Sequence, residues 1–310
     1  MQIAVIGCGA MGGLYSAYLS QENNVTVIDT NKKTIAAIQN DGIEVMEPDG
    51  TTATYHPNAA TTTEGMDPVD LVIIFVKSTT TKRALHDDAN LIGPNTYLLT
   101  LQNGGGHEKV LSEFVQRDHI IVGTTQHNAA RNGDGKVRHG GSGLTVIGPL
   151  GFDVEALAPV VETFNSCGIE TRADRDVQRL IWNKLFTNVS ASALTALFQM
   201  PLGYIVDNPN AWTLCERLIR EAVKVAAAAG YTFEVNEKIN EVRNVCEASP
   251  QGVTSIQSDI AAGRRTEVDT ITGFVVDTAY TLGVSVPCHW FVRNAVHAFE
   301  GRGAFGLDTK

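Results

Sequence analysis

The sequence lacks a long apolar run and contains few cysteines. A helix that crosses a bilayer needs roughly 20 consecutive apolar residues, and no segment of the 310 residues approaches that length. The five cysteines are scattered, odd in number and form no Cys-x-x-Cys pair. These features favour a reduced cytoplasmic protein over a disulfide-stabilised fold or a zinc protein, and we predict no metal site.

Basic side chains are also scarce. The chain has 24 Lys and Arg against 34 Asp and Glu, which gives a formal net charge of −10, and no basic stripe is visible. Nucleic acids and anionic membranes bind surfaces on which Lys and Arg gather. No charged leader precedes an apolar stretch at the N-terminus, so a secretion signal is not expected. We therefore expect neither nucleic acid nor a membrane as a partner.

The first half of the chain alternates short β-branched runs with helical patterns. Continuous apolar runs separated by helices are typical of a parallel sheet that is covered on both faces. The predicted strands are residues 3–6, 25–28, 71–76, 97–101 and 120–123. A glycine-rich stretch at 138–143 is expected to form a turn that leads into a late strand at 144–147.

The first predicted strand runs straight into a glycine-rich turn, Gly7-Cys8-Gly9-Ala10-Met11-Gly12, and a helical pattern follows. A strand, a G-x-G-x-x-G turn, a helix and a second strand are the context that a dinucleotide-binding turn requires. Gly7 permits the tight turn, Gly9 lets a pyrophosphate approach the backbone, and Gly12 lets helix and strand pack closely. The helix N-terminus supplies free N–H groups for the phosphates. We therefore predict a dinucleotide site rather than a purely structural turn.

After about residue 175, strand signals become rare. The segments 212–230 and 271–282 have helical spacing instead. A chain of 310 residues with 43% hydrophobic content is long enough for two domains of typical size. We predict an α/β fold with an N-terminal Rossmann doubly wound sheet in residues 1–174 and a C-terminal all-helical domain in residues 175–310.

The second predicted strand ends in Asp29, which lies 20 residues after Gly9 (29 − 9). A carboxylate there can accept hydrogen bonds from the adenosine ribose of NAD. It would repel the 2′-phosphate of NADP, by about 1 kcal/mol in water and about 4 kcal/mol at an effective dielectric constant of 20 for unit charges about 4 Å apart. Lys32 and Lys33 could fold back onto a phosphate, but their ordinary role is that of solvated first-turn lysines. We predict NAD as the cofactor.

A polar stripe interrupts the apolar segment 180–195. On a helix, Lys184, Asn188, Ser192 and Thr195 are spaced by 4, 4 and 3 residues, so they share one face. In one interpretation Lys184 reaches solvent and the other polar groups bond to neighbouring backbone. In the other, the helix lines a cleft and aims these groups at a ligand. The stripe alone leaves both interpretations open.

A second group of polar residues surrounds Glu267. Arg264, Arg265 and Thr266 precede it, and another apolar helical pattern follows. Glu267 is a plausible anionic partner for Lys184. Taken by itself, the segment could equally be a solvated charged loop in which Thr266 caps the next helix.

Together these motifs resemble the ketopantoate reductase (2-dehydropantoate 2-reductase) family over the whole chain. The matching segments are 6–12, Phe75-Val76-Lys77, Gln102-Asn103-Gly104, Gly123-Thr124-Thr125, Asn183-Lys184-Leu185-x-x-Asn188 and Gly263-Arg264-x-Thr266-Glu267-x-Asp269. The resemblance implies a Rossmann domain followed by a helical domain for substrate binding and dimerisation. It also implies a small 2-oxo acid or 2-hydroxy acid as the substrate, and a homodimer.

The resemblance also implies roles for individual residues. Lys184 corresponds to the family's general acid, and Glu267 to the residue near this lysine and the nicotinamide ribose. Asn103 corresponds to a residue that bridges cofactor and substrate. Further positions are implied to contact the substrate (Asn188, Ser192, Leu202 and Ser255) or the cofactor (the glycine turn 7–12, Asp29, Lys77 and Ala129).

The implied reaction explains why a lysine interrupts an apolar helix. Reduction of a 2-oxo acid places a hydride on the carbonyl carbon and negative charge on the carbonyl oxygen. A positively charged proton donor stabilises that oxygen and then neutralises it. Lysine can do both when partial burial lowers its pKa and a carboxylate orients it.

Two positions depart from the pattern of ketopantoate-reducing members. Ser192 and Leu202 stand where those members carry asparagines that hold the polar end of the substrate. Leucine offers no side-chain hydrogen bond, so it suits a substrate with an apolar side chain. With Asp29, this pattern resembles the NAD-dependent D-2-hydroxyacid dehydrogenase branch that includes D-mandelate dehydrogenase. Its substrates are branched or aromatic 2-oxo acids.

Two other functions compete with this prediction. One is 2-dehydropantoate 2-reductase with NADPH, which Asp29, Ser192 and Leu202 disfavour. The other is a redox sensor that binds NAD without catalysis. A sensor needs only the glycine turn, so it does not explain why Lys184 and Glu267 occur together. Three histidines, His127, His139 and His289, are not assigned a role.

Overall fold

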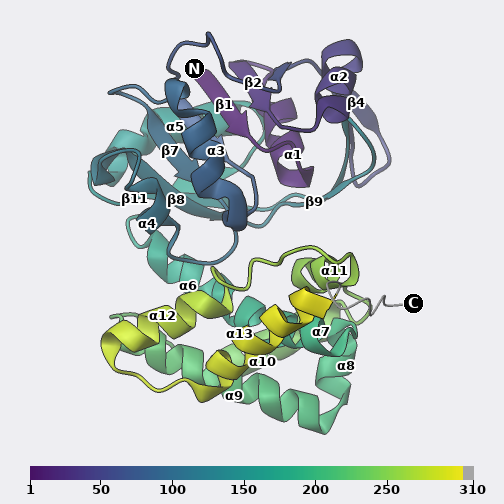
Figure 1. Ribbon diagram of the computed structural model, residues 1–310, viewed down its shortest axis with the longest axis vertical. Helices are drawn as coiled ribbons and strands as arrows, with labels where there is room; N and C mark the ends of the chain where they lie inside the picture. The colour runs from purple at the N-terminus through teal and green to yellow at the C-terminus, as the bar shows by residue number, and fades with distance from the viewer. Residues whose placement is uncertain (303–310) are drawn as a thin grey trace. The chain divides into compact units, whose positions relative to one another are not determined.

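The structure is a computed structural model that describes residues 1–302. The chain divides into two compact units (Figure 1). The first unit comprises Met1–Gln102 and His107–Gln178, and the second comprises Asn103–Gly106 and the chain from Arg179 onward. The short segment Asn103–Gly106 therefore belongs to the second unit although it lies within the first in sequence. The expected division at residues 174 and 175 lies close to the second crossing of the chain but does not include Asn103–Gly106.

The first unit is built on an eight-stranded sheet with the order β12-β11-β8-β7-β6-β1-β2-β5. The strands are β1 (Gln2–Ile6), β2 (Asn24–Ile28), β5 (Asn58–Ala60), β6 (Leu71–Ile74), β7 (Tyr97–Thr100), β8 (Ile120–Thr125), β11 (Thr145–Pro149) and β12 (Thr171–Ala173). Neighbours from β8 to β5 are parallel, whereas β11 runs antiparallel to β8. The chain thus winds from β1 outward through β2 in one direction and through β6 in the other, which confirms the predicted Rossmann-type α/β domain.

Helices cover this sheet and explain its apolar strands. The helices are α1 (Ala10–Leu19), α2 (Lys32–Asp41), α3 (Thr81–Asp87), α4 (His107–Leu111) and α5 (Ala158–Ser166). All four residues of the central strand β6 are fully buried. A strand that is covered on both faces has no solvent side, so it reads as a continuous apolar run rather than as an alternating one.

A second, four-stranded sheet was not predicted. It has the order β4-β3-β10-β9, with β3 (Ile43–Met46), β4 (Thr52–Tyr55), β9 (Asn128–Arg131) and β10 (Lys136–Gly141). The turn expected at 138–143 is wrong in its first part, because those residues belong to β10, whereas the late strand is confirmed as β11. Burial alternates along β10, with Val137 and His139 inside and Lys136 and Arg138 outside. The glycines of this segment hid the alternation in the sequence.

Two of the unassigned histidines, His139 of β10 and His127 before β9, belong to a buried chain of hydrogen bonds. His127 Nδ1 lies 3.1 Å from His139 Nε2, and His139 Nδ1 lies 2.8 Å from Glu47 Oε2. The Tyr18 hydroxyl donates to Glu47 Oε1 at 2.6 Å. Buried polar groups need such partners, so these histidines connect the small sheet to α1.

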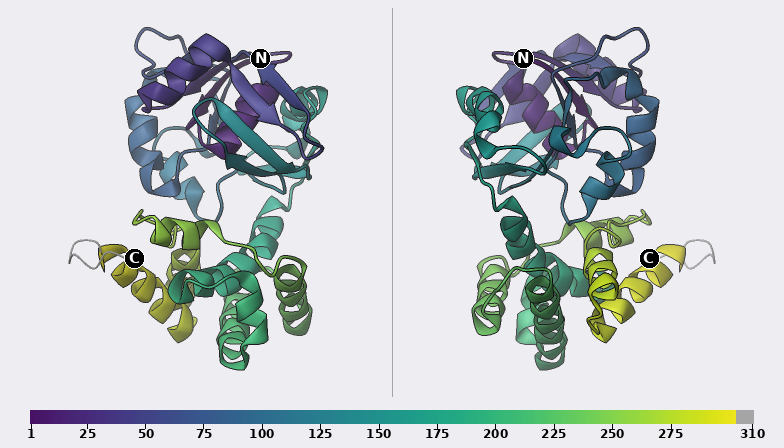
Figure 2. Two further views of the ribbon diagram at one scale, coloured as in Figure 1. Left: turned by 90° about the vertical axis from the view of Figure 1, so that its right-hand side faces the viewer. Right: turned by 90° about the vertical axis from the view of Figure 1, so that its left-hand side faces the viewer.

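The second unit is helical, as predicted. Its helices are α6 (Val177–Thr187), α7 (Ala193–Phe198), α8 (Leu202–Asp207), α9 (Pro209–Ala228), α10 (Val235–Ala248), α11 (Ser255–Ala261), α12 (Thr272–Leu282) and α13 (Pro287–Glu300). In the described part of this unit the side views of Figure 2 show helices and loops without a sheet. Long apolar side chains such as Trp182, Phe186 and Leu218 form its core. Among residues 1–302, no helix combines the length and apolar character that a membrane span requires.

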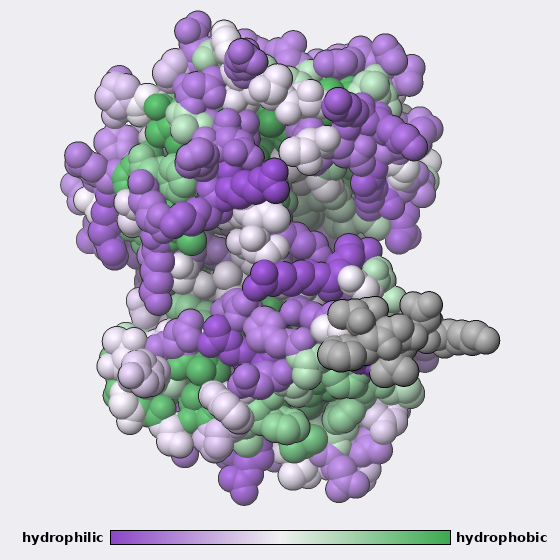
Figure 3. Space-filling model, in the orientation of Figure 1, coloured by the Kyte–Doolittle hydropathy of each residue, from purple (hydrophilic) through white to green (hydrophobic). Residues whose placement is uncertain are grey.

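Most of the face in Figure 3 is hydrophilic, with apolar patches over the second unit. Tyr280 on α12 and Trp290 and Phe291 on α13 are exposed by 89%, 60% and 63%. Large exposed apolar patches often mark a contact with another protein. The homodimer stays a prediction.

The glycine turn allows α1 to pack closely on the sheet. Gly7 has φ +102°, and a Cβ atom there would lie 2.6 Å from the Val76 backbone nitrogen. A Cβ atom on Gly12 would lie 1.8 Å from the Gly7 carbonyl oxygen, whereas one on Gly9 would meet nothing within 4 Å. The turn therefore excludes side chains at Gly7 and Gly12 for structural reasons and leaves the space at Gly9 open.

We predict that Gly12→Ala lowers the free energy of unfolding by about 1–3 kcal/mol, because the added methyl group forces the packed backbones apart. Gly9→Ala is the matched control, and its free energy of unfolding should stay within about 0.5 kcal/mol of the wild type. Urea denaturation followed by circular dichroism measures both. Equal stability of the two variants would contradict this account of the turn.

Candidate functional site

A groove in the first unit lies at the carboxyl ends of its central strands. It has a volume of about 450 Å³. Its lining includes Gly7 and Gly9 after β1, Asp29 after β2 and Lys77 after β6. The chain continues from β1 to β2 on one side and later to β6 on the other side of β1, and ligands of doubly wound sheets bind at such a switch point. The groove therefore has the position expected of a dinucleotide site.

The N-terminus of α1 has the features of an anion-binding site. Its N-cap is Gly9, which has no side chain that could bond the first helical N–H groups. Those groups carry the partial positive charge of the helix end, and phosphates bind to such ends. Because a Cβ atom on Gly9 would touch nothing, a bulky ligand can approach the backbone here. The residues of the turn fit a pyrophosphate.

Asp29 is held in place by the backbone on both sides. The Cys8 N–H donates to Asp29 Oδ2 at 2.7 Å, and the Asn31 N–H donates to Oδ1 at 2.8 Å. The carboxylate thus ties the glycine turn to the start of α2. Each carboxylate oxygen accepts more than one hydrogen bond, so Asp29 retains capacity for ribose hydroxyls.

Lys33 of α2 and Arg131 of β9 lie near the carboxylate of Asp134. Hydrogen bonding by Thr34, followed by the charges of Arg131 and Lys33, lowers the pKa of Asp134. Arg131 Nη2 also donates to Thr34 Oγ1 at 2.8 Å. Lys33 and Arg131 therefore have an anion close by, and the interpretation of Lys33 as a phosphate ligand gains no support from this arrangement.

Three further cofactor positions differ in their surroundings. Lys77 is half-buried and lines the groove. Ala129 lies on β9, opposite His139 of β10, and is absent from the described lining of the groove. Burial, and then the neighbouring Asp29 carboxylate, raise the pKa of the Cys8 thiol to about 12. Cys8 therefore stays protonated near neutral pH and contributes its backbone N–H rather than a thiolate.

Lys184 lies on α6 of the second unit among apolar neighbours. Trp182 and Phe186 on the same helix are buried in the core, and Lys184 itself is half-buried. Burial lowers the pKa of Lys184 to about 8, because desolvation disfavours the ammonium. A lysine with this pKa can give up a proton near neutral pH.

The helix does not continue regularly after Lys184. Residues Asn188–Ser192 form a π-helical turn between α6 and α7. Such turns insert an extra residue and occur frequently at functional sites. The even spacing predicted for the polar stripe therefore holds from Lys184 to Asn188, and the π turn rotates the positions that follow.

The two ends of the stripe have different surroundings. Asn188 is half-buried, whereas Ser192 and Thr195 are buried. Thr195 Oγ1 donates to the Ser192 carbonyl oxygen at 2.7 Å and lies 2.7 Å from Thr254 Oγ1. The Thr195 hydroxyl is thus used in packing α7 against the start of α11.

Leu202 and Ser255 lie at neighbouring helix starts. The Leu202 N–H donates to the Gly252 carbonyl oxygen at 3.1 Å, and its side chain joins the buried core of the second unit. Ser255 is exposed at the start of α11, where the Thr254 side chain caps the helix by accepting the Gln257 N–H at 3.3 Å. Leu202 thus places an apolar surface close to the α11 N-terminus.

The segment Asn103–Gly106 docks onto the turn that follows Glu267. The Gly105 N–H donates to the Thr270 carbonyl oxygen at 2.9 Å. Gly104 has φ +100°, and a Cβ atom there would lie 2.2 Å from the same oxygen. Only glycine allows this approach, so the run of three glycines after Asn103 was the sequence signal for the contact. The sequence prediction missed it.

Phe274 connects this segment to the helix of Lys184. A Cβ atom on Gly105 would lie 2.7 Å from the Phe274 ring, and the Phe274 and Trp182 ring centroids are 5.1 Å apart. The second unit thus joins the segments that carry an amide (Asn103), an ammonium (Lys184) and a carboxylate (Glu267).

Among residues 1–302, no group of three or more His, Cys, Asp and Glu side chains is arranged to hold a metal ion.

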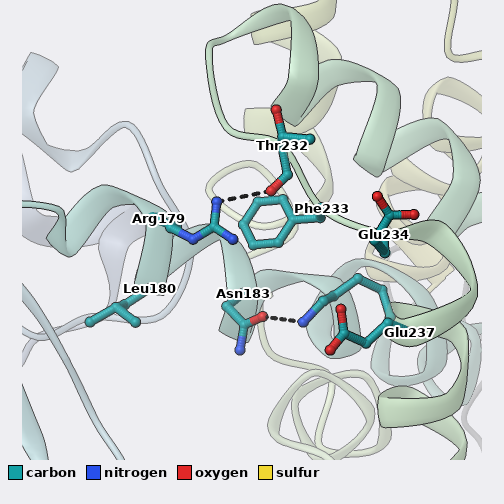
Figure 4. Close-up of a pocket in the computed structure, with 8 residues that line it drawn as sticks. Arg179, Leu180, Asn183, Thr232, Phe233, Glu234 and Glu237 are labelled. Atoms are coloured by element: carbon teal, nitrogen blue, oxygen red, sulfur yellow. Dashed lines mark hydrogen bonds between the residues drawn. The ribbon is translucent and has the colours of Figure 1, made fainter.

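A separate pocket of about 330 Å³ is lined by residues of α6 and by the segment that leads into α10 (Figure 4). Arg179 donates to the Thr232 carbonyl oxygen at 2.9 Å and stacks over the Phe233 ring. Lys238 is buried and donates to Asn183 Oδ1 at 2.7 Å. Asn183, although it belongs to the matching motif, therefore supports the packing of α6 against α10.

Comparison with known proteins covers both units. The sequence profile of the family described as ketopantoate reductase PanE/ApbA matches residues 3–151, and that of its C-terminal domain matches residues 176–300. The 2-dehydropantoate 2-reductase of Halobacterium salinarum is 36% identical over 293 residues, which cover 93% of this chain and 95% of that protein. The 2-dehydropantoate 2-reductase of Pyrococcus horikoshii is 29% identical, with 98% and 99% covered.

Solved structures agree with this result. The ternary structure of D-mandelate dehydrogenase with NADH and anilino(oxo)acetate has a TM-score of 0.89 at 28% identity, over 97% of this chain and 99% of that chain. A PanE/ApbA family ketopantoate reductase from Ralstonia eutropha JMP134 has a TM-score of 0.89 at 25% identity, over 98% and 100%. The groove of the first unit, the lysine of the second and these matches lead to one conclusion. The chain belongs to the ketopantoate reductase family of oxidoreductases.

Proposed function

We propose that the protein reduces branched or aromatic 2-oxo acids to D-2-hydroxy acids with NADH, and that Lys184 donates the proton. The observation that carries this proposal is the half-buried Lys184, whose pKa burial lowers to about 8. A solvated structural lysine keeps a pKa near its ordinary value. The D-mandelate dehydrogenase structure with NADH adds support, because its chain is similar to this one over nearly its whole length.

The residues of the chain have distinct roles in this reaction. The turn 7–12 and Asp29 would hold the dinucleotide, whose nicotinamide supplies the hydride when it is bound. The Lys184 ammonium stabilises the negative charge that develops on the carbonyl oxygen and then protonates that oxygen. Glu267 keeps the ammonium oriented, and Asn103 holds the substrate by its amide.

Lys184→Ala should lower kcat for reduction by about 10² to 10⁴, because positioned acid catalysis contributes that much. Lys184→Arg should stay slow, since a guanidinium keeps the charge but does not release a proton. In the wild type, kcat for reduction should fall as the pH rises through about 8, where the ammonium loses its proton. Oxidation of the hydroxy acid should instead become faster over the same range.

Absorbance at 340 nm measures these rates, and fluorescence measures NADH binding. The exposed Lys224 on α9 provides the control, because Lys224→Ala should leave kcat unchanged. Loss of NADH binding in Lys184→Ala, or a kcat that does not depend on pH near 8, would argue against Lys184 as the proton donor.

The cofactor preference should depend on the charge of Asp29. We expect kcat/KM to be much higher with NADH than with NADPH in the wild type. Asp29→Asn keeps an acceptor for the Cys8 N–H but removes the charge, so the gap should narrow by roughly tenfold or more, as expected for a few kcal/mol of repulsion. The same assay with both cofactors measures this. Equal use of NADH and NADPH by the wild type would contradict the prediction.

The substrate preference should follow the apolar surface at Leu202. A ketopantoate hydroxyl that is buried against leucine loses a hydrogen-bond partner, which costs roughly 1–3 kcal/mol. We therefore expect a higher kcat/KM for 2-oxoisovalerate or benzoylformate than for ketopantoate. The double variant Ser192→Asn with Leu202→Asn should shift the ratio toward ketopantoate. Chiral chromatography of the product should show the D configuration.

A second candidate is 2-dehydropantoate 2-reductase. It is favoured by the relatives, since the Halobacterium salinarum enzyme of that name is 36% identical to this chain. A wild-type kcat/KM for ketopantoate that is tenfold or more above those of the other two acids would favour this candidate over the first.

A further inference from the structure

Helix α13 holds the turn that carries Glu267 through three side chains. Arg293, His297 and Glu300 are spaced by 4 and 3 residues, so they project from one face of the helix. Arg293 Nε donates to Asp269 Oδ1 at 2.9 Å, and His297 Nε2 lies 3.1 Å from the same oxygen. We call these three side chains the α13 clamp.

The other end of the turn is held by Glu300. Its Oε1 accepts both the N–H and the hydroxyl of Thr266 at 2.6 Å, and its Oε2 lies 2.8 Å from His297 Nδ1. Both ring nitrogens of His297 therefore face carboxylate oxygens. An imidazole donates to two carboxylates only when both nitrogens carry protons, so this arrangement favours the imidazolium form of His297.

The clamp fixes the backbone on both sides of Glu267. Thr266 precedes it and Asp269 follows it by two residues, and each is bound to α13. Within the turn, Thr266 Oγ1 accepts the Val268 N–H at 3.2 Å, and the Glu267 carbonyl oxygen accepts the Ile271 N–H at 3.1 Å. Thr266 and Val268 are buried, whereas Glu267 is half-buried. The backbone on both sides of Glu267 is thus held in place by hydrogen bonds.

We propose that the α13 clamp is a positioning device, in which His297 acts through Glu267 on the reacting Lys184. This inference rests on the proposed function, because it assumes that Glu267 orients the proton donor. No residue of the clamp is assigned to contact cofactor or substrate. A displacement of a catalytic group by about 1 Å can cost up to about a hundredfold in rate, so a clamp of this kind matters for kcat more than for substrate affinity.

The charges around His297 set the pH range of the clamp. Burial opposes its protonation, but hydrogen bonds to Glu300 and Asp269 raise the pKa of His297 overall. Although burial works against them as well, bonds from His297 and its neighbours lower the pKa of Asp269 and of Glu300. The clamp is therefore complete below the pKa of His297 and above those of the two acids.

Two further charged side chains contact the residues that surround His297. Arg265 lies 3.7 Å from Asp269, and Asp277 of α12 pairs with Arg293 at 2.9 Å. Helix α7, which packs on α13, has no ionisable side chain. On α9, Glu221 is bonded to His289. When His297 deprotonates, its neutral imidazole keeps a single N–H and can donate to only one of the two carboxylates.

The test is a double-mutant cycle between His297→Gln and Glu267→Gln, with Asn294→Ala on the exposed side of α13 as the control. His297→Gln should lower kcat by about tenfold while KM and NADH binding stay within twofold. In the wild type, kcat should fall when His297 loses its proton, and His297→Gln should remove this fall. The separate decline of kcat near pH 8, which belongs to Lys184, should remain. In the Glu267→Gln background, His297→Gln should cause less than a twofold further loss.

The outcomes separate the two proposals. If Glu267→Gln leaves kcat unchanged, the role of Glu267 in the proposed function is wrong. If Glu267→Gln lowers kcat but His297→Gln does not, or if the two losses multiply, the clamp is not a positioning device for Glu267. Circular dichroism and the Tm of each variant show whether it is folded. If His297→Gln is unfolded, Arg293→Lys replaces it in the cycle, with the same expected and contrary results.

Discussion

Partial removal of a lysine ammonium from water is the constraint on which the helical unit depends. Burial lowers the pKa of Lys184 to about 8, and the helix must stay fixed for that to persist. Trp182 and Phe186, which flank Lys184 on the same helix, are fully packed in the core. If α6 could rotate, the ammonium would reach solvent and its pKa would return toward the ordinary value. The apolar packing therefore contributes to the chemistry as well as to stability.

Glycine has the same physical role at two places in the molecule. Gly7 in the first unit and Gly104 in the second both have positive φ, and a Cβ atom at either would collide with the backbone of another segment. Gly7 brings the glycine turn against the end of β6, and Gly104 brings the segment of Asn103 against Thr270. Gly9 differs, because its surroundings are open and its lack of a side chain serves a ligand.

Several histidines are paired with carboxylates, namely His139 with Glu47, His289 with Glu221 and His297 with Asp269 and Glu300. Paired groups of this kind specify how elements pack, and they give two of the unassigned histidines, His139 and His289, a structural setting. The shift of the Lys184 pKa has burial as its cause. A pKa that is set by desolvation and lies near the working pH is the property that acid–base catalysis requires.

The sequence by itself determined the α/β class, the main strands, the helical second unit and the glycine turn between β1 and α1. These features depend on local patterns, in which apolar runs, helical spacing and glycine positions are read over a few residues. The small sheet was missed because glycines mask the alternation in β10. The π turn after Lys184 could not be predicted, since it packs against α9, which lies further along the chain. The docking of Asn103–Gly106 and the clamp on Glu267 were likewise decided by the tertiary structure, because they join residues that are far apart in the chain and become neighbours only when the helices pack.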